Sequence, residues 1–148
     1  MALKNYTTTI DADKTANEIG RMLAKAGAKA VLTEYSDNGE YLESLSFKIR
    51  VNDRDVGFRL PVDWKPVQRV LKKQKKNNSR IKATREQAVR VAWRIAKDWI
   101  DAQLAIIETD MVEPEQVFLP YMVTQDNRTL YEQVRKNKFL PEGSHEQG

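Results

Sequence analysis

The stretch "SLSFKIRVNDRDVGFRL", residues 44–60, decides the fold of this chain. Apolar residues alternate with polar ones on both sides of the turn-like segment "NDRD". Alternation with a period of two is typical of strands that bury one face, so the two halves should pair as an antiparallel hairpin. We expect the apolar side chains to face the core: Leu45, Phe47, Ile49, Val56, Phe58 and Leu60. We expect the basic side chains to face outward: Lys48, Arg50 and Arg59.

A further strand and a helix are predicted before this hairpin. "KAVLTEY", residues 29–35, has strand character, and "SDNGE" after it contains Asn38-Gly39, a strong signal for a hairpin turn. Upstream, apolar residues recur at helical spacing from about residue 14 to 26. Asp13 can cap the start of that helix, and Gly27 suits its end.

The longest predicted helix is "TREQAVRVAWRIAKDWIDAQLAIIETDM", residues 84–111. Thr84 followed by Gln87 is a capping-box pattern, and the apolar arc is wide enough for the main helix of a core. We expect Ile95 and Trp99 at the centre of that core. Trp93 should close its rim, with stacking on a nucleic-acid base as the alternative.

The remaining chain should add short helices only. One is expected after Pro66, followed by a basic loop, and another at residues 127–137. Residues 141–148 read as a disordered tail. The sequence therefore predicts a single α+β domain over residues 1–140: an N-terminal helix, a three-stranded antiparallel meander, a long core helix and short C-terminal helices.

Positive charge is concentrated in one region. The chain nets +4, but residues 71–100 carry ten basic and two acidic side chains, whereas residues 101–148 carry four basic and nine acidic ones. Lysine runs are commonly solvated loops. Here the run crowds the start of the long helix, where cations oppose the helix dipole and where exposed N–H groups favour phosphate. We therefore predict phosphate contacts from Lys72, Lys73, Lys75, Lys76, Arg80, Lys82, Arg85, Arg90, Arg94 and Lys97.

Several classes of chemistry are excluded or disfavoured. There is no cysteine, and the one histidine, His145, lies in the expected tail, which leaves no catalytic triad and no zinc ligand set. No glycine-rich phosphate-binding motif occurs. Carboxylates at 11 and 13, and at 108, 110 and 113, suit helix ends better than a metal site. We expect no catalytic residue, metal or cofactor, no membrane partner, and a cytoplasmic protein without a signal peptide.

The order of helix, three-stranded meander and lysine-preceded helix resembles that of double-stranded RNA-binding domains. Those domains grip phosphates from the start of their last helix and recognise shape more than sequence. The corresponding stretch here, "SRIKATREQA", departs from the usual lysine-alanine pattern, and the helix is about twice as long. The resemblance is one of topology.

The amino-acid sequence resembles that of small uncharacterised proteins of bacterial phages, prophages and mobile elements. The matching stretches are "AKAGAKAVLTEY", "SLSFKI", "FRLPV", "TREQAVRVAWRIAKDWIDAQLAIIETDMVEPEQVFLPYM" and "TLYEQV". This resemblance implies an intracellular setting in a bacterial host and brings no activity with it. Small basic proteins in that setting handle nucleic acid, sequester nucleotide signals or block host defence complexes.

Three functions remain open. The first is non-enzymatic binding of RNA or DNA through its phosphates. The second is docking on an acidic protein or ribonucleoprotein surface, as an inhibitor or accessory subunit. The third is sequestration of a small phosphorylated nucleotide. Neither the oligomeric state nor a base preference follows from the sequence.

Overall fold

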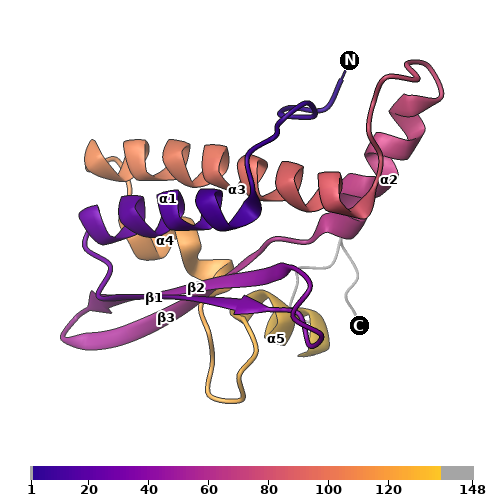
Figure 1. Ribbon diagram of the computed structural model, residues 1–148. Helices are drawn as coiled ribbons and strands as arrows, with labels where there is room; N and C mark the ends of the chain where they lie inside the picture. The colour runs from indigo at the N-terminus through magenta and orange to yellow at the C-terminus, as the bar shows by residue number, and fades with distance from the viewer. Residues whose placement is uncertain (1, 138–148) are drawn as a thin grey trace, which may run out of the picture.

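The computed structural model describes residues 2–137 and shows an α+β fold (Figure 1), which confirms the predicted class. The predicted tail and His145 lie outside the described residues. The elements follow in this order: α1 (Ala12–Lys25), β1 (Ala30–Tyr35), β2 (Leu42–Val51), β3 (Arg54–Pro61), α2 (Trp64–Lys75), α3 (Arg85–Glu108), α4 (Pro114–Phe118), the 3-10 helix η1 (Leu119–Tyr121) and α5 (Leu130–Asn137).

The sheet is the predicted antiparallel meander in the order β1-β2-β3. Phe47 pairs with Phe58 and Leu45 with Leu60, so the apolar side chains of the two strands share one face. Asn52 and Asp53 join the strands with φ angles of 51° and 64°, as a tight two-residue hairpin turn requires. The expected inward set is buried or half-buried, and the expected outward set lies on the opposite face.

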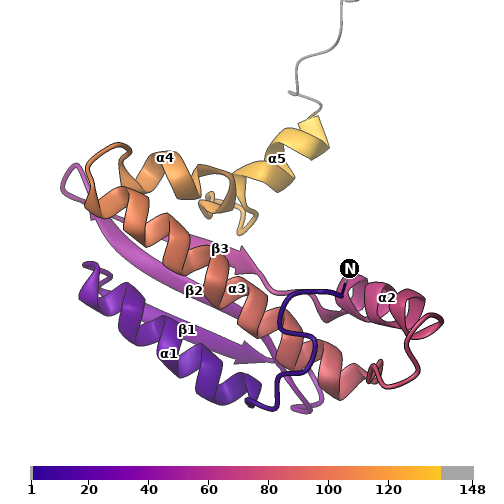
Figure 2. The ribbon, with the colours of Figure 1, turned by 90° about the horizontal axis from the view of Figure 1, so that it is seen from above.

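Helices α1 and α3 lie side by side over one face of the sheet (Figures 1 and 2). Between these layers Ile19 of α1, Leu45 and Phe58 of the sheet and Trp93 of α3 are almost completely buried. Phe118 of α4 completes this core by packing edge-on against Phe47, with ring centroids 5.2 Å apart. The core therefore joins α1, α3 and α4 to the sheet.

The two tryptophans of α3 exchange the roles predicted for them. Trp93 is 1% exposed, and its indole Nε1 donates a hydrogen bond to the Leu42 carbonyl oxygen at 3.3 Å. Trp99 is half-buried and packs edge-on against Phe118 and Tyr121. Ile95 is also only half-buried. The wide apolar arc of α3 is divided between two clusters, and Ile95 packs against the one that faces α2 instead of the sheet. Trp99 belongs with the sheet cluster but is one of the partly buried side chains packed against it.

Two helix starts also differ from the prediction. Asp11 is the N-cap residue of α1, although its side chain makes no capping hydrogen bond, and Asp13 lies in the first turn. Helix α2 begins before Pro66, because the Asp63 carboxylate accepts a hydrogen bond from the Lys65 backbone N–H at 3.0 Å. A proline in the first turn removes only an N–H that has no partner within the helix. Helix α2 ends at Lys75, so much of the expected basic loop is helical.

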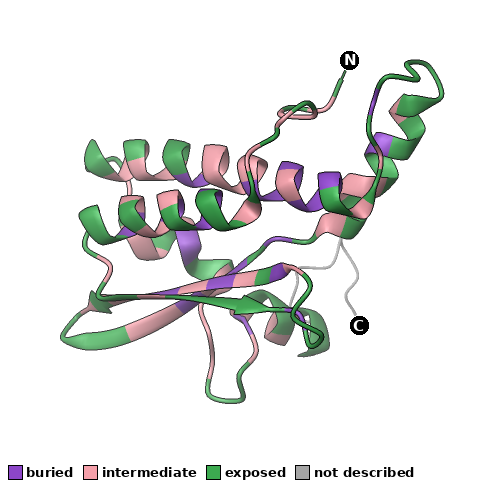
Figure 3. Ribbon diagram, viewed as in Figure 1, coloured by how far each residue is buried: buried purple, intermediate pink, exposed green. Residues whose placement is uncertain are grey.

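Helix α2 and the loop after it, residues 64–84, project beyond the rest of the molecule and are called the arm here (Figure 1). Figure 3 shows that the far part of the arm is largely exposed. A second cluster of Leu71, Ile81, Ala88 and Val91 binds the base of the arm to α3. The N-terminal segment, residues 2–9, packs Leu3 and Tyr6 against this cluster.

Within residues 2–137, no helix is both long enough and apolar enough to cross a lipid bilayer.

Candidate phosphate-binding surface

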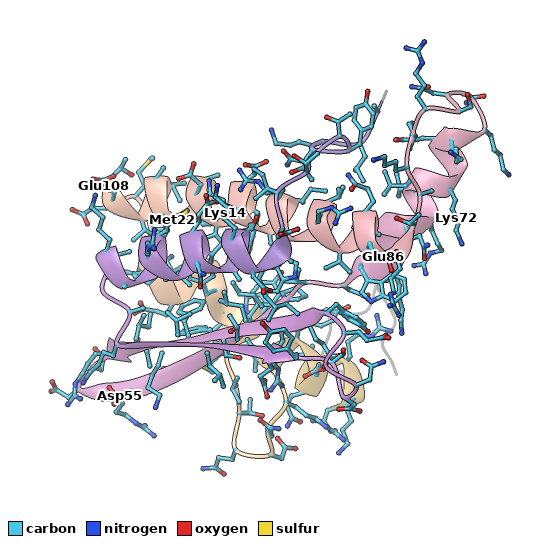
Figure 4. All side chains as sticks on the ribbon, in the orientation of Figure 1. Lys14, Met22, Asp55, Lys72, Glu86 and Glu108 are labelled. Atoms are coloured by element: carbon cyan, nitrogen blue, oxygen red, sulfur yellow. The ribbon has the colours of Figure 1, made fainter. Side chains whose placement is uncertain are left out.

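The arm carries an unbroken excess of positive charge. Between Asp63 and Glu86 the sequence has nine basic residues and no acidic one. The last turn of α2 and the loop after it expose six of the ten predicted site residues, of which Lys75 forms hydrogen bonds within the protein. Within residues 2–137 none of the other five side chains forms an ion pair: Lys72, Lys73, Lys76, Arg80 and Lys82. Figure 4 shows Lys72 on α2 pointing away from the core. Unpaired, solvated cations are available to an external anion.

The position of the lysines in the fold differs from the one predicted. Lys72, Lys73 and Lys75 lie in the last turn of α2, and Lys76 is its C-terminal cap residue. Cations are favourable at a helix C-terminus, so helix stability alone accounts for part of this run. Only Arg80, Lys82 and Arg85 precede or begin α3, where the N–H groups at the helix start attract anions.

Lys75 has a structural role. Its ammonium Nζ donates hydrogen bonds to the backbone carbonyl oxygens of Ser79 at 3.0 Å and Ile81 at 2.7 Å. These two bonds close the turn between α2 and α3 and hold Ile81 against the second cluster. The lysine therefore shapes the arm, and its charge is partly used within the protein.

Arg85 and Arg94 are also committed to internal contacts. Arg85 forms an ion pair with Glu40 at 3.1 Å, and its guanidinium lies over the Tyr41 ring, 5.4 Å from the centroid. Arg94 is 17% exposed and binds Glu18 at 2.7 Å. These arginines tie α3 to the β1–β2 turn and to α1, so the basic residues predicted along α3 do not form one continuous row of free cations.

Arg90 differs from these two. Its Nε donates to the Gln87 side-chain oxygen at 3.0 Å, and within the described residues its two terminal nitrogens have no hydrogen-bond or ion-pair partner. Gln87 is only 3% exposed and also donates from Nε2 to the carbonyl oxygens of Tyr6 and Thr8, at 3.0 and 2.9 Å. One buried amide thus fixes the N-terminal segment on α3 and orients Arg90. Lys97, further along α3, is half-buried and forms no ion pair with another described residue.

The N-terminal segment, Arg90 and the loop of the arm enclose a recess of about 290 Å³. Its lining includes the threonines at 7–9, Arg80 and Lys82 of the arm, and Gln87 and Arg90 of α3. No acidic side chain lines it. By contrast, the larger hollow beside β3, about 610 Å³, is lined by Glu43, Asp63 and Glu132 among others.

The threonines were missed by the sequence reasoning. The run of three was visible, but it gains meaning only because the fold brings it beside Arg80 and Lys82, which are far away along the chain. Of the ten predicted residues, the structure brings Arg80, Lys82 and Arg90 together at this recess. Among residues 2–137 no group of three or more histidine, aspartate or glutamate side chains is arranged to hold a metal ion.

Comparisons with family models, with curated proteins and with solved structures find no match to this chain.

Proposed function

We propose that this protein binds nucleic acid without catalysing a reaction, and that the arm contacts the phosphate backbone. The observation that carries the proposal is the exposed basic end of the arm, with five unpaired cations and no acidic residue between Asp63 and Glu86. Neutralising phosphates with lysine and arginine releases counterions, which supplies most of the affinity of sequence-independent binding.

The binding mode follows from where the aromatic side chains lie. Trp93 is buried, so stacking on a base, the alternative considered for it, has no support. Trp64, at the start of the arm, packs edge-on against Tyr41 with ring centroids 5.9 Å apart. The exposed end of the arm has no aromatic residue. Contacts should therefore reach phosphates and not bases, which gives affinity with little sequence preference.

The setting is part of the same proposal. The stretches that resemble proteins of phages and mobile elements support an origin in such an element and an intracellular location in a bacterial host. In that setting, a small protein that coats or grips nucleic acid regardless of sequence has an evident use.

Binding of the purified full chain to labelled RNA and DNA strands at low salt tests the proposal. The variant Lys72→Gln/Lys73→Gln/Lys76→Gln should bind all strands at least tenfold more weakly. The matched control Lys14→Gln/Arg21→Gln/Lys25→Gln removes three exposed charges from α1 and should bind nearly as the native protein does. Absence of binding in low salt by a folded protein would overturn the proposal.

A second candidate function, docking on a protein or ribonucleoprotein, is favoured by the edge of the sheet. On the outer edge strand β1, Leu32 is 58% exposed and Tyr35 53%. Unpaired strand edges with apolar side chains are common sites of strand addition. Cross-linking in the native cell tests it: a nuclease-resistant adduct with one defined protein, lost in Leu32→Lys, would support docking, whereas no such adduct would reject it.

A further inference from the structure

The recess beside the arm differs from a solvated lysine surface because its walls are held in place. Gln87 fixes residues 6–8 on α3, and the Asn5 side chain adds a hydrogen bond to Asp98 at 2.8 Å. On the other side, the buried Ile81 and the two bonds from Lys75 hold the loop that carries Arg80 and Lys82. A ligand would therefore meet backbone segments that are already positioned, which reduces the entropy lost on binding.

The groups that line the recess are mostly hydrogen-bond donors without partners. The hydroxyls of Thr7 and Thr9 form no hydrogen bond within the described residues, whereas that of Thr8 accepts one from the Ile10 N–H at 3.1 Å. Arg80, Lys82 and the terminal nitrogens of Arg90 are likewise unpaired there. Hydroxyl and guanidinium donors arranged around one space match an acceptor with several oxygens.

Charge decides which acceptor fits. The lining contains Arg80, Lys82 and Arg90 and no carboxylate. A backbone phosphate diester carries one negative charge and is flanked by sugars on both sides. A phosphate monoester carries close to two charges near neutral pH, offers three terminal oxygens and is attached on one side only. A recess with three cations therefore favours the monoester.

We propose that this recess binds a phosphate monoester group. The source is either the phosphorylated end of a nucleic-acid strand lying along the arm or a free mononucleotide. The inference rests on the proposed function to the extent that a strand held by the arm would deliver its end to the recess. Arg80 and Lys82 would serve both surfaces, because they lie where the arm meets the recess.

The experiment compares three single strands of one sequence, with a 5′-phosphate, a 3′-phosphate or hydroxyls at both ends. We expect one phosphorylated end to bind about tenfold more tightly than the hydroxyl strand, as a few charge-assisted hydrogen bonds would give. Thr7→Val/Thr9→Val removes two hydroxyls that have no internal partner, and should reduce that ratio to near one without lowering affinity for the hydroxyl strand. Lys72→Gln/Lys73→Gln should weaken all three strands alike and leave the ratio unchanged.

Each outcome decides a different point. Equal affinity for all three strands, together with no binding of adenosine monophosphate, would overturn the recess as a phosphate site and leave the proposed function standing. If no strand binds, the proposed function fails. Titration with inorganic phosphate or adenosine monophosphate then decides whether the recess binds a phosphate group. Saturable NMR shifts of the backbone amides of residues 7–9 would then support it, whereas their absence would reject it. Tight binding of the mononucleotide with no preference among the strands would identify the free nucleotide as the source.

Discussion

The Lys75 ammonium nitrogen lies 2.7 Å from the backbone carbonyl oxygen of Ile81, to which it donates a hydrogen bond. This contact separates Lys75 from the other lysines in the run, because it stabilises the arm whereas they are free to meet an anion. A charge change at Lys75 should therefore affect folding, whereas a charge change at Lys73 should affect mainly binding.

Lys75→Ala should lower the free energy of unfolding by about 1 kcal/mol, since it removes a charged donor from two carbonyl oxygens. Lys73→Ala should change it by less than about 0.5 kcal/mol, as is usual at an exposed position. Urea denaturation of both variants measures the difference. Equal effects of the two substitutions would show that the Lys75 bonds do not hold the arm in solution.

The tryptophans give a sharper test of the core. Trp93→Ala should cost about 3–5 kcal/mol, because it empties a fully buried site and leaves the Leu42 carbonyl oxygen without its donor. Trp99→Ala should cost less, about 1–3 kcal/mol, because the side chain is half-buried and its edge-on ring contacts add modestly. Thermal or urea unfolding compares them. A larger loss for Trp99 would contradict the packing described for α3.

Glu132 should make the C-terminal part of the fold sensitive to acid. Its carboxylate accepts a hydrogen bond from the Thr129 N–H at 2.8 Å, and this bond holds the pKa of Glu132 below its ordinary value. Burial raises that pKa, whereas the Arg59 guanidinium lowers it further. A depressed carboxyl pKa stabilises the folded state at neutral pH, and this contribution disappears as the pH falls through that lowered pKa.

Glu132→Gln should therefore unfold slightly more easily at pH 7, by less than about 1 kcal/mol because the pair is exposed. The difference from the native protein should shrink as the pH falls from 7 into the acid range, and it should vanish only below the lowered pKa of Glu132. Unfolding curves across this range measure it. A difference that persists unchanged in acid would mean that packing, and not the carboxylate charge, is what the substitution removes.

The sequence was most informative where the signal is local. The alternation from Leu45 to Leu60 predicted both the meander and its buried face, because side chains in a strand alternate whatever lies above them. The Thr84 cap was predicted for the same reason, and its hydroxyl accepts from the Gln87 N–H at 3.1 Å. The return bond of a capping box does not form: the Gln87 side-chain oxygen accepts from Arg90 Nε, and its Nε2 donates to the carbonyl oxygens of Tyr6 and Thr8.

Prediction failed where distant segments meet. Nothing near Trp93 or Ile95 indicates that α2 covers one part of the apolar arc and the sheet another. The recess is a second case, since the threonines at 7–9 and Arg80 come together only through Gln87 and the second cluster. Likewise, the basic residues of α3 looked alike in sequence, yet Arg94 is bound to Glu18 whereas the terminal nitrogens of Arg90 are unpaired.

The central claim, that the arm binds nucleic-acid phosphates, is tested most directly by the salt dependence of affinity. With five unpaired cations making contacts, log K against log salt should fall with a slope of about 3.5 for single strands and 4.5 for duplex DNA, or roughly two to three orders of magnitude over a fourfold rise in salt. Neutralising Lys72, Lys73 and Lys76 should lower the single-strand slope by about 2, whereas the α1 control variant should keep it. A slope near zero in the native protein, or equal slopes in the native protein and both variants, would contradict the account.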